Sequence, residues 1–236
     1  MKLTVVMPFF NEEALLPGVA GLCERVRAAL EGHDIELLAV DDGSTDGTAA
    51  GLASVTGLDL VVRHERNRGV GAAMTTGLTR AAGDLALVYD PDEAYAVECL
   101  PALLEGVRDA DVATLSPYHP DGGVEGVGPI RLLLSRSASR LYRWRLKHRL
   151  YTFTCAVRAY RVATTRALLP APDDYTAAAY LLAAALRAGL RVVEVPAVLR
   201  VRSRGKSKMR VGRVIGAHLR LLRDLPVTAP GSKSRP

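Results

Sequence analysis

The hydrophobic positions in the first 95 residues fall into two alternating patterns. Short apolar runs at residues 4–8, 35–40, 58–63 and 85–89 have the length and composition of buried strands. Between these runs the apolar residues recur at helical spacing, most clearly over residues 11–32 and 72–82. Asn11 is a suitable N-cap for the first helix and Gly32 ends it. The alternation predicts an α/β protein with a Rossmann-like, doubly wound, mostly parallel sheet and helices on both faces.

The second half continues this pattern less regularly. We expect helices at 98–108, 131–149, 175–187 and 211–225, and strands at 111–116, 153–161 and 191–195. The Gly- and Pro-rich residues 118–128 predict a mobile loop. We expect one domain over residues 1–225, with a disordered tail at 226–236.

Two carboxylates follow the fourth predicted strand. Asp90 and Asp92 stand one residue apart where the strand ends, and ligands of open α/β sheets bind outside the carboxyl ends of strands. Hard cations prefer oxygen ligands, so this pair indicates a Mg²⁺ or Mn²⁺ site that also holds a diphosphate. The alternative for an isolated Asp-Pro-Asp is a solvated turn. The position after the fourth strand, downstream of Asp41 and Asp42, favours the metal site.

Gly69 and Gly71 precede the helix at 72–82. They do not form a dinucleotide fingerprint, because Met74 stands where the third glycine belongs and the segment follows the third strand instead of the first. Two glycines before a helix would still let a phosphate approach the helix N-terminus.

Charge is distributed unevenly along the chain. Residues 1–130 contain 8 Lys and Arg against 21 Asp and Glu, whereas residues 131–236 contain 23 against 4. The acidic half suits a metal and sugar hydroxyls, and the basic half suits phosphates or an anionic membrane surface. The three cysteines form no Cys-x-x-Cys pair, which indicates reduced thiols in a cytoplasmic protein. Residues 1–4 lead directly into a predicted strand, so we expect no signal peptide.

Two basic segments carry this charge. The predicted helix 131–149 mixes arginines with Leu and Trp, which is typical either of a membrane-surface helix or of a helix that packs one face on the core. Residues 200–208 are densely basic and suit a diphosphate or a phosphate monoester. A nucleic-acid arm is the competing interpretation, but no recognition motif or aromatic stacking platform accompanies the segment.

Several motifs together resemble the inverting family 2 glycosyltransferases of the GT-A fold, most of all the dolichyl- and polyprenyl-phosphate mannose synthases. The resemblance covers nearly the whole chain. Its segments are VMPFFNEE (6–13), VDDGSTDGT (40–48), NRGVGAA (67–73), DPD (90–92), RAYR (158–161), AGLRVVEVP (188–196) and RGKSK (204–208).

The resemblance implies a role for each matching residue. The nucleotide would be bordered by Pro8, Phe10, Glu12, Asp41, Asp42, Arg68 and Asp90. Asp90 and Asp92 would bind Mg²⁺ or Mn²⁺. The acceptor phosphate would be gripped by Arg131, Arg202, Arg204 and Lys208. Catalysis would rest on Asp92, Arg202 and Lys208, and the helix from Arg131 would lie on the membrane.

The chain departs from the family pattern around the donor sugar and the acceptor. Ala94 replaces a Gln, Pro117 an Arg, Thr152 an Asp and Tyr180 a Glu. Glu93 either replaces the missing metal neighbour or is a surface acid.

The resulting prediction is a metal-dependent inverting glycosyltransferase. It would move a sugar, mannose first, from GDP-mannose or a UDP-sugar to polyprenyl phosphate, while attached peripherally to the inner face of the membrane. The alternative is a soluble glycosyltransferase that acts on a small-molecule hydroxyl, with Asp174 or its neighbour Asp173 as the base. A cap of the helix at 175–187 is the favoured interpretation of Asp174 from the sequence. A third possibility is a non-catalytic protein that binds membranes or nucleic acid through its basic half.

Overall fold

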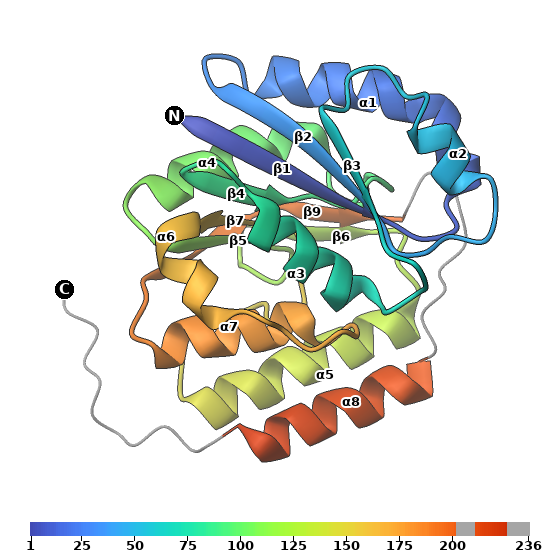
Figure 1. Cartoon of the computed structure of the whole chain (residues 1–236). Helices are drawn as coiled ribbons and strands as arrows, with labels where there is room; N and C mark the ends of the chain where they lie inside the picture. Colours follow the sequence, from blue (N-terminus) through green and yellow to red (C-terminus); the bar gives the residue numbers. More distant parts are fainter. Residues whose placement is uncertain (202–210, 226–236) are drawn as a thin grey trace.

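The computed structural model describes residues 1–201 and 211–225, and its centre is a seven-stranded sheet (Figure 1). The strand order is β3-β2-β1-β4-β7-β5-β8. The strands are β1 Lys2–Phe9, β2 Asp34–Asp41, β3 Leu60–Arg63, β4 Leu85–Val88, β5 Val112–Ser116, β7 Arg158–Arg161 and β8 Val192–Pro196. β7 runs antiparallel to β4 and β5, whereas the other neighbouring strands are parallel. The prediction of a mostly parallel α/β sheet is therefore confirmed.

Helices cover both faces of the sheet (Figure 1). They are α1 Leu16–Ala29, α2 Thr48–Leu52, α3 Val70–Arg80, α4 Leu100–Arg108, α5 Pro129–Leu146, α6 Val162–Thr165, α7 Ala177–Arg187 and α8 Val211–Asp224, with 3₁₀ turns η1 Glu13–Leu15, η2 Val97–Cys99 and η3 Arg166–Leu168. Alternate residues of β1 enter two different cores. Val5 and Met7 pack with α1 and α4, whereas Val6 packs with α3 and α7.

The register of the sheet brings functional positions to one edge. β1 lies between β2 and β4, and Val6 is level with both Leu38 and Val88. The residues that follow β1, β2 and β4 therefore leave the sheet side by side at its carboxyl edge.

Three local expectations were wrong. Residues 118–128 are not all loop, because Gly123–Glu125 forms β6 and pairs with β9 (Val198–Arg200) in a separate two-stranded sheet. The strand expected at 153–161 is confined to Arg158–Arg161. Asn11 does not cap a helix, since it adopts a φ of 51° and bonds to the loop after β2, and α1 begins only after η1.

Arg158 explains why the strand at β7 is short. This side chain is fully buried and donates from Nε to Thr114 Oγ1 at 3.0 Å and from Nη2 to the carbonyl oxygen of Phe153 at 2.9 Å. The Phe153 carbonyl is thus turned toward the guanidinium instead of a neighbouring strand. The segment before β7 consequently wraps around the arginine.

The expected tail at 226–236 lies outside the described residues. None of the helices in residues 1–201 and 211–225 has the length and hydropathy that are needed to span a bilayer.

Candidate active site

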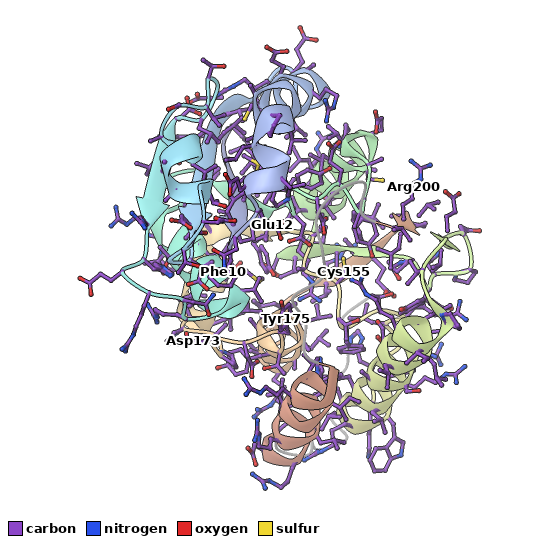
Figure 2. All side chains as sticks on the ribbon, turned by 90° about the vertical axis from the view of Figure 1, so that its right-hand side faces the viewer. Phe10, Glu12, Cys155, Asp173, Tyr175 and Arg200 are labelled. Carbon is purple, nitrogen blue, oxygen red and sulfur yellow. The ribbon has the colours of Figure 1, made fainter. Side chains whose placement is uncertain are left out.

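A cleft of about 1260 Å³ opens at the carboxyl edge of the sheet. Its walls come from the ends of β1, β2 and β4 on one side and from α5, α7 and α8 on the other. Figure 2 labels four of the lining residues, Phe10, Glu12, Cys155 and Tyr175. The cleft therefore lies where the sequence predicted a ligand site, between the acidic and the basic halves.

The Asp-Pro-Asp segment forms a tight turn after β4, and Asp90 and Asp92 both line the cleft. Asp92 Oδ1 accepts the Ala94 amide at 3.1 Å, and the Glu93 amide donates to the Asp90 carbonyl at 3.3 Å. The buried Tyr89 ties the turn down by donating its hydroxyl to the Tyr95 carbonyl at 2.7 Å. Burial and the nearby acids raise the pKa of Tyr89 well above its usual value, so the hydroxyl stays protonated as a donor.

Glu93 does not act as a third carboxylate of this pair. It has a φ of 53°, and its Oε1 lies 2.7 Å from Nη2 of Arg25 on α1. Glu93 is also absent from the residues that line the cleft. Of the two interpretations of Glu93, the structure supports the surface acid.

The donor atoms around Asp90 and Asp92 fit a hard divalent ion. Both side chains are partly buried and offer only carboxylate oxygens, the donor type that Mg²⁺ and Mn²⁺ prefer. Within residues 1–201 and 211–225, no group of three or more His, Cys, Asp or Glu side chains gathers into a metal site. A metal at this edge would therefore need substrate oxygens and water to complete its coordination.

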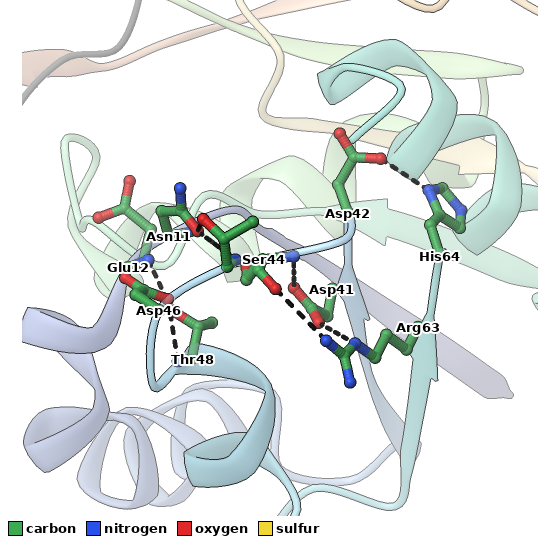
Figure 3. Close-up of polar contacts among 10 residues, drawn as sticks. Asn11, Glu12, Asp41, Asp42, Ser44, Asp46, Thr48, Arg63 and His64 are labelled. Atoms are coloured by element: carbon green, nitrogen blue, oxygen red, sulfur yellow. Dashed lines mark hydrogen bonds and ion pairs between the residues drawn. The ribbon is translucent and has the colours of Figure 1, made fainter. Parts of the chain in front are cut away.

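The wall at the end of β1 is formed by Pro8, Phe10 and Glu12. This wall is held by the loop after β2 (Figure 3). The Asn11 amide donates to Ser44 Oγ at 2.9 Å, and Asn11 Oδ1 accepts the Thr45 amide at 2.7 Å. The Glu12 amide donates to Thr48 Oγ1 at 2.8 Å. The serine and threonines of the VDDGSTDGT segment thus position the predicted nucleotide wall.

The adjacent acids Asp41 and Asp42 occupy different places. Asp41 is fully buried, accepts the Ser44 amide at 3.0 Å, and pairs through Oδ2 with Nε of Arg63 at 3.2 Å. It does not line the cleft, and its place beside the nucleotide stays a prediction from the resemblance. The reason is that successive strand residues point to opposite sides, which turns Asp41 toward Arg63 and Asp42 toward the cleft.

Asp42 lines the cleft and is surrounded by donors. Its Oδ1 accepts the Arg68 amide at 3.0 Å and lies 2.7 Å from Nδ1 of His64, and its Oδ2 accepts the Gly69 amide at 2.6 Å. Figure 3 shows the contact with His64. Sequence reasoning missed His64, because a lone histidine after a strand carries no motif.

The N-terminus of α3 is closed by protein. The Gly71 and Ala72 amides donate to the Asp173 carbonyl at 2.8 and 3.3 Å. A Cβ on Gly71 would lie 1.9 Å from the Pro172 carbonyl oxygen, and one on Gly69 would lie 2.3 Å from that of Asp173. The glycines therefore admit the 172–173 loop, and the expectation that they admit a phosphate was wrong.

The remaining predicted residues divide into two groups. Arg68, Arg131 and Asp174 line the cleft, whereas Arg202, Arg204 and Lys208 lie outside the described residues. Asp174 Oδ1 accepts the Thr176 amide at 2.8 Å and the Thr176 hydroxyl at 2.5 Å, an arrangement that supports its role in the turn that leads into α7.

Three of the four family departures also line the cleft, namely Ala94, Pro117 and Thr152. Thr152 Oγ1 lies 2.8 Å from Ser116 Oγ, and the Thr152 amide donates to Glu194 Oε1 at 2.8 Å. The Thr152 side chain thus offers the cleft a hydroxyl and no charge of its own.

The far wall of the cleft is made by α5 and α8, which lie side by side (Figure 1). The Tyr142 hydroxyl of α5 lies 2.9 Å from Nδ1 of His218 on α8. Burial lowers the pKa of His218, and the Asp174 carboxylate acts in the opposite direction. Burial, and secondarily Asp174, raises the pKa of Tyr142, so the phenol donates and the neutral imidazole accepts.

Comparison with known proteins shows which family the chain resembles. Residues 4–167 match the family model described as glycosyl transferase family 2. The chain is 36% identical over 217 residues to the polyprenol monophosphomannose synthase of Mycolicibacterium smegmatis. This match covers 87% of this chain and 80% of that protein. It is 30% identical to the dolichol-phosphate mannosyltransferase of Pyrococcus furiosus, where the match covers 93% of this chain but only 62% of the relative.

Solved structures agree on the fold. The chain is similar to glucosyl-3-phosphoglycerate synthase from Mycobacterium tuberculosis in complex with Mn²⁺, UDP and phosphoglyceric acid, with a TM-score of 0.71 and 22% identity over 95% of this chain and 79% of that one. The same protein in complex with Mg²⁺ and UDP gives a TM-score of 0.70 at 23% identity, over 95% and 80%. These similarities show a shared GT-A fold. The match over residues 4–167 and the 36% identity to the mannose synthase of Mycolicibacterium smegmatis establish that the chain belongs to glycosyl transferase family 2.

Proposed function

We propose that this glycosyltransferase moves a sugar, mannose first, from a nucleotide sugar to polyprenyl phosphate. The observation that supports the proposal is one continuous cleft, which extends from Asp90 and Asp92 to the α5–α8 wall. The similarity to a polyprenol monophosphomannose synthase at 36% identity supports the acceptor class and the sugar. GDP-mannose is accordingly the first donor to test, and UDP-sugars are the second.

The cleft suits a displacement in which a nucleoside diphosphate leaves. Asp90 and Asp92 would hold Mg²⁺ or Mn²⁺, which when bound neutralises the growing charge of the diphosphate. Pro8, Phe10, Glu12, Asp42 and Arg68 would border the nucleotide. Arg202 and Lys208 are kept as proposed partners of the phosphates from the sequence alone, and Arg204 as a partner of the acceptor phosphate.

A phosphate acceptor also matches the acid–base chemistry of the cleft. A phosphate monoester has a second pKa near 6 and is already ionised at pH 7, so it needs no strong general base. A hydroxyl acceptor would need one. Asp174 is the candidate for that role, but its carboxylate already accepts two hydrogen bonds from Thr176. This favours the phosphate over the small-molecule hydroxyl.

The α5–α8 face suits contact with an anionic membrane. The exposed apolar side chains of these helices are Ile130, Leu133, Leu141, Trp144, Ile215 and Leu219, of which Leu141, Ile215 and Leu219 also line the cleft. The exposed basic residues of the same helices are Arg131, Arg136, Arg140, Arg213, Arg220 and Arg223. Apolar side chains interspersed with arginines are typical of helices that lie in a membrane interface.

The two interpretations of α5, a membrane-surface helix and a helix that packs one face on the core, are compatible. The helix packs Ser139, Tyr142 and Leu146 into the protein while Trp144 remains 76% exposed. We therefore place the enzyme peripherally on the membrane. The free thiols of Cys23, Cys99 and Cys155 support the cytoplasmic side, where thiols stay reduced.

The experiment that tests this function is a donor screen with polyprenyl phosphate. GDP-mannose, UDP-glucose and UDP-N-acetylglucosamine are each incubated with the purified chain, Mn²⁺ and the lipid phosphate, and products are followed by mass. We expect a glycosyl phosphate lipid from one donor. No transfer to the lipid phosphate from any donor would contradict the proposal.

A further inference from the structure

We propose that His64 is a positioning residue for the nucleotide-binding wall, acting through Asp42. This inference rests on the proposed function, because it assumes that Asp42 faces the nucleotide. His64 directly follows β3 and is held there by its own amide, which donates to the Asp41 carbonyl at 2.8 Å. Its side chain is 9% exposed and that of Asp42 is 2% exposed.

The imidazole is held from both sides. Nδ1 lies 2.7 Å from Asp42 Oδ1, and Nε2 lies 2.8 Å from Oγ1 of Thr76 on α3. Since the carboxylate only accepts, Nδ1 carries a hydrogen and donates. The hydroxyl of Thr76 can accept from or donate to Nε2, so the contact is satisfied in either protonation state. Thr76 thus contacts the outer nitrogen of the ring, and the contact that holds the carboxylate is the one from Nδ1.

Asp42 connects His64 to the backbone that forms the wall of the cleft. Asp42 accepts the amides of Arg68 and Gly69, which belong to the connection between β3 and α3. Arg68, Gly69 and Asp42 itself all line the cleft. A series of contacts therefore runs from Thr76 through His64 and Asp42 to the backbone of the cleft wall.

The contact with His64 matters because Asp42 is buried. A buried carboxylate is costly unless hydrogen bonds satisfy it, and hydrogen bonds to ionised groups are among the stronger ones. The neighbouring Arg63 does not compensate Asp42, because it pairs with Asp41. Loss of the imidazole donor would leave Asp42 Oδ1 with the Arg68 amide among its described contacts, and the carboxylate could turn away from its place in the cleft.

Two substitutions separate this role from mere packing. The side-chain amide of Asn reaches the position of Nδ1, whereas that of Gln reaches the position of Nε2. His64→Asn therefore keeps the donor to Asp42, and His64→Gln loses it while keeping a polar group toward Thr76. Thr76→Val removes only the outer hydroxyl. His33→Gln, in the turn between α1 and β2, is the matched control outside the cleft.

The test is the affinity for UDP and GDP in the presence of Mn²⁺, measured by calorimetry beside the melting temperature of each variant. We expect His64→Gln to weaken nucleotide binding about tenfold or more. His64→Asn and Thr76→Val should stay within about threefold of wild type, and His33→Gln should match it.

Each result decides the matter. Wild-type affinity in His64→Gln would overturn the inference, and so would an equal loss of affinity and of melting temperature in His64→Asn and His64→Gln, which indicates packing alone. If the wild-type chain binds neither UDP nor GDP, the proposed function fails and the inference fails with it. If the wild type binds and only the ordering of the variants is wrong, the proposed function stands.

Discussion

The carbonyl oxygen of Asp173 accepts the amide hydrogen of Gly71 at 2.8 Å and thereby closes the first turn of α3. Two loops that are distant in the sequence are joined at this point, one before α3 and one before α7. The helix N-terminus, often an anion site, is thus occupied by protein. In the proposed function, the charge of the diphosphate is therefore assigned to a metal at Asp90 and Asp92 and to basic side chains and not to this helix N-terminus.

Replacement of Gly71 tests this contact. The Cβ of Gly71→Ala would lie 1.9 Å from a backbone oxygen, which cannot move aside as a flexible side chain would. We expect the free energy of unfolding to fall by about 3 kcal/mol in chemical denaturation. The control is Gly216→Ala on α8, where a Cβ meets nothing within 4 Å and a helical alanine is neutral or slightly stabilising. Equal stability of the two variants would show that the loops do not approach so closely.

The exposed Trp144 gives a prediction for membrane contact. Trp144→Ser should lower partitioning onto anionic lipid vesicles about tenfold, because a large apolar side chain no longer enters the interface. The matched control is Leu60→Ser on β3, an exposed apolar residue that lies in the sheet and not on the α5–α8 face. Vesicle sedimentation at low and high salt measures both effects. An equal loss in the two variants would argue against a specific membrane face.

The pH dependence of stability should reflect His218. Burial lowers the pKa of His218 below 6.5, so the folded chain keeps the imidazole neutral. Its contribution to stability is full above pH 6.5 and is lost as the pH falls toward the lower pKa of the folded state, because the unfolded chain binds the proton first. Burial lowers the pKa of His148 in the same direction. We expect His218→Gln to lose less unfolding free energy than wild type between pH 7.5 and 5.5. An unchanged acid loss would assign the effect to His148 or to other groups.

The sequence predicted the fold well where periodicity is strong. Leu3 to Phe9 and Leu85 to Val88 are buried runs, and their length alone separates them from helices. The three-residue strands β6 and β9 escaped prediction, because so short a stretch has no measurable period. The start of β7 was predicted five residues too early, at residue 153 instead of Arg158. The Phe153 carbonyl accepts a hydrogen bond from the buried Arg158, and no local sequence pattern predicts such a contact.

The site was predicted only in part, for a physical reason. Asp90 and Asp92 lie in the cleft because the end of a buried strand fixes where they point. Asp41 and Asp42 have the same chemistry and are adjacent, and only the register of β2 decides which of them faces the cleft. His64 could be recognised as part of the site only from its contacts with Asp42, which directly follows β2, and with Thr76 on α3.

Asp92 gives the most direct test of the central claim, that this cleft transfers sugar with the help of a divalent ion. Product formation on polyprenyl phosphate is measured by mass for wild type with Mn²⁺, for wild type with EDTA, and for Asp92→Ala with Mn²⁺. The control is Asp109→Asn, an exposed acid at the end of α4 that does not line the cleft. We predict product with wild type and with the control, and a loss of at least a hundredfold with EDTA or Asp92→Ala. Undiminished product in EDTA and in Asp92→Ala would contradict the claim.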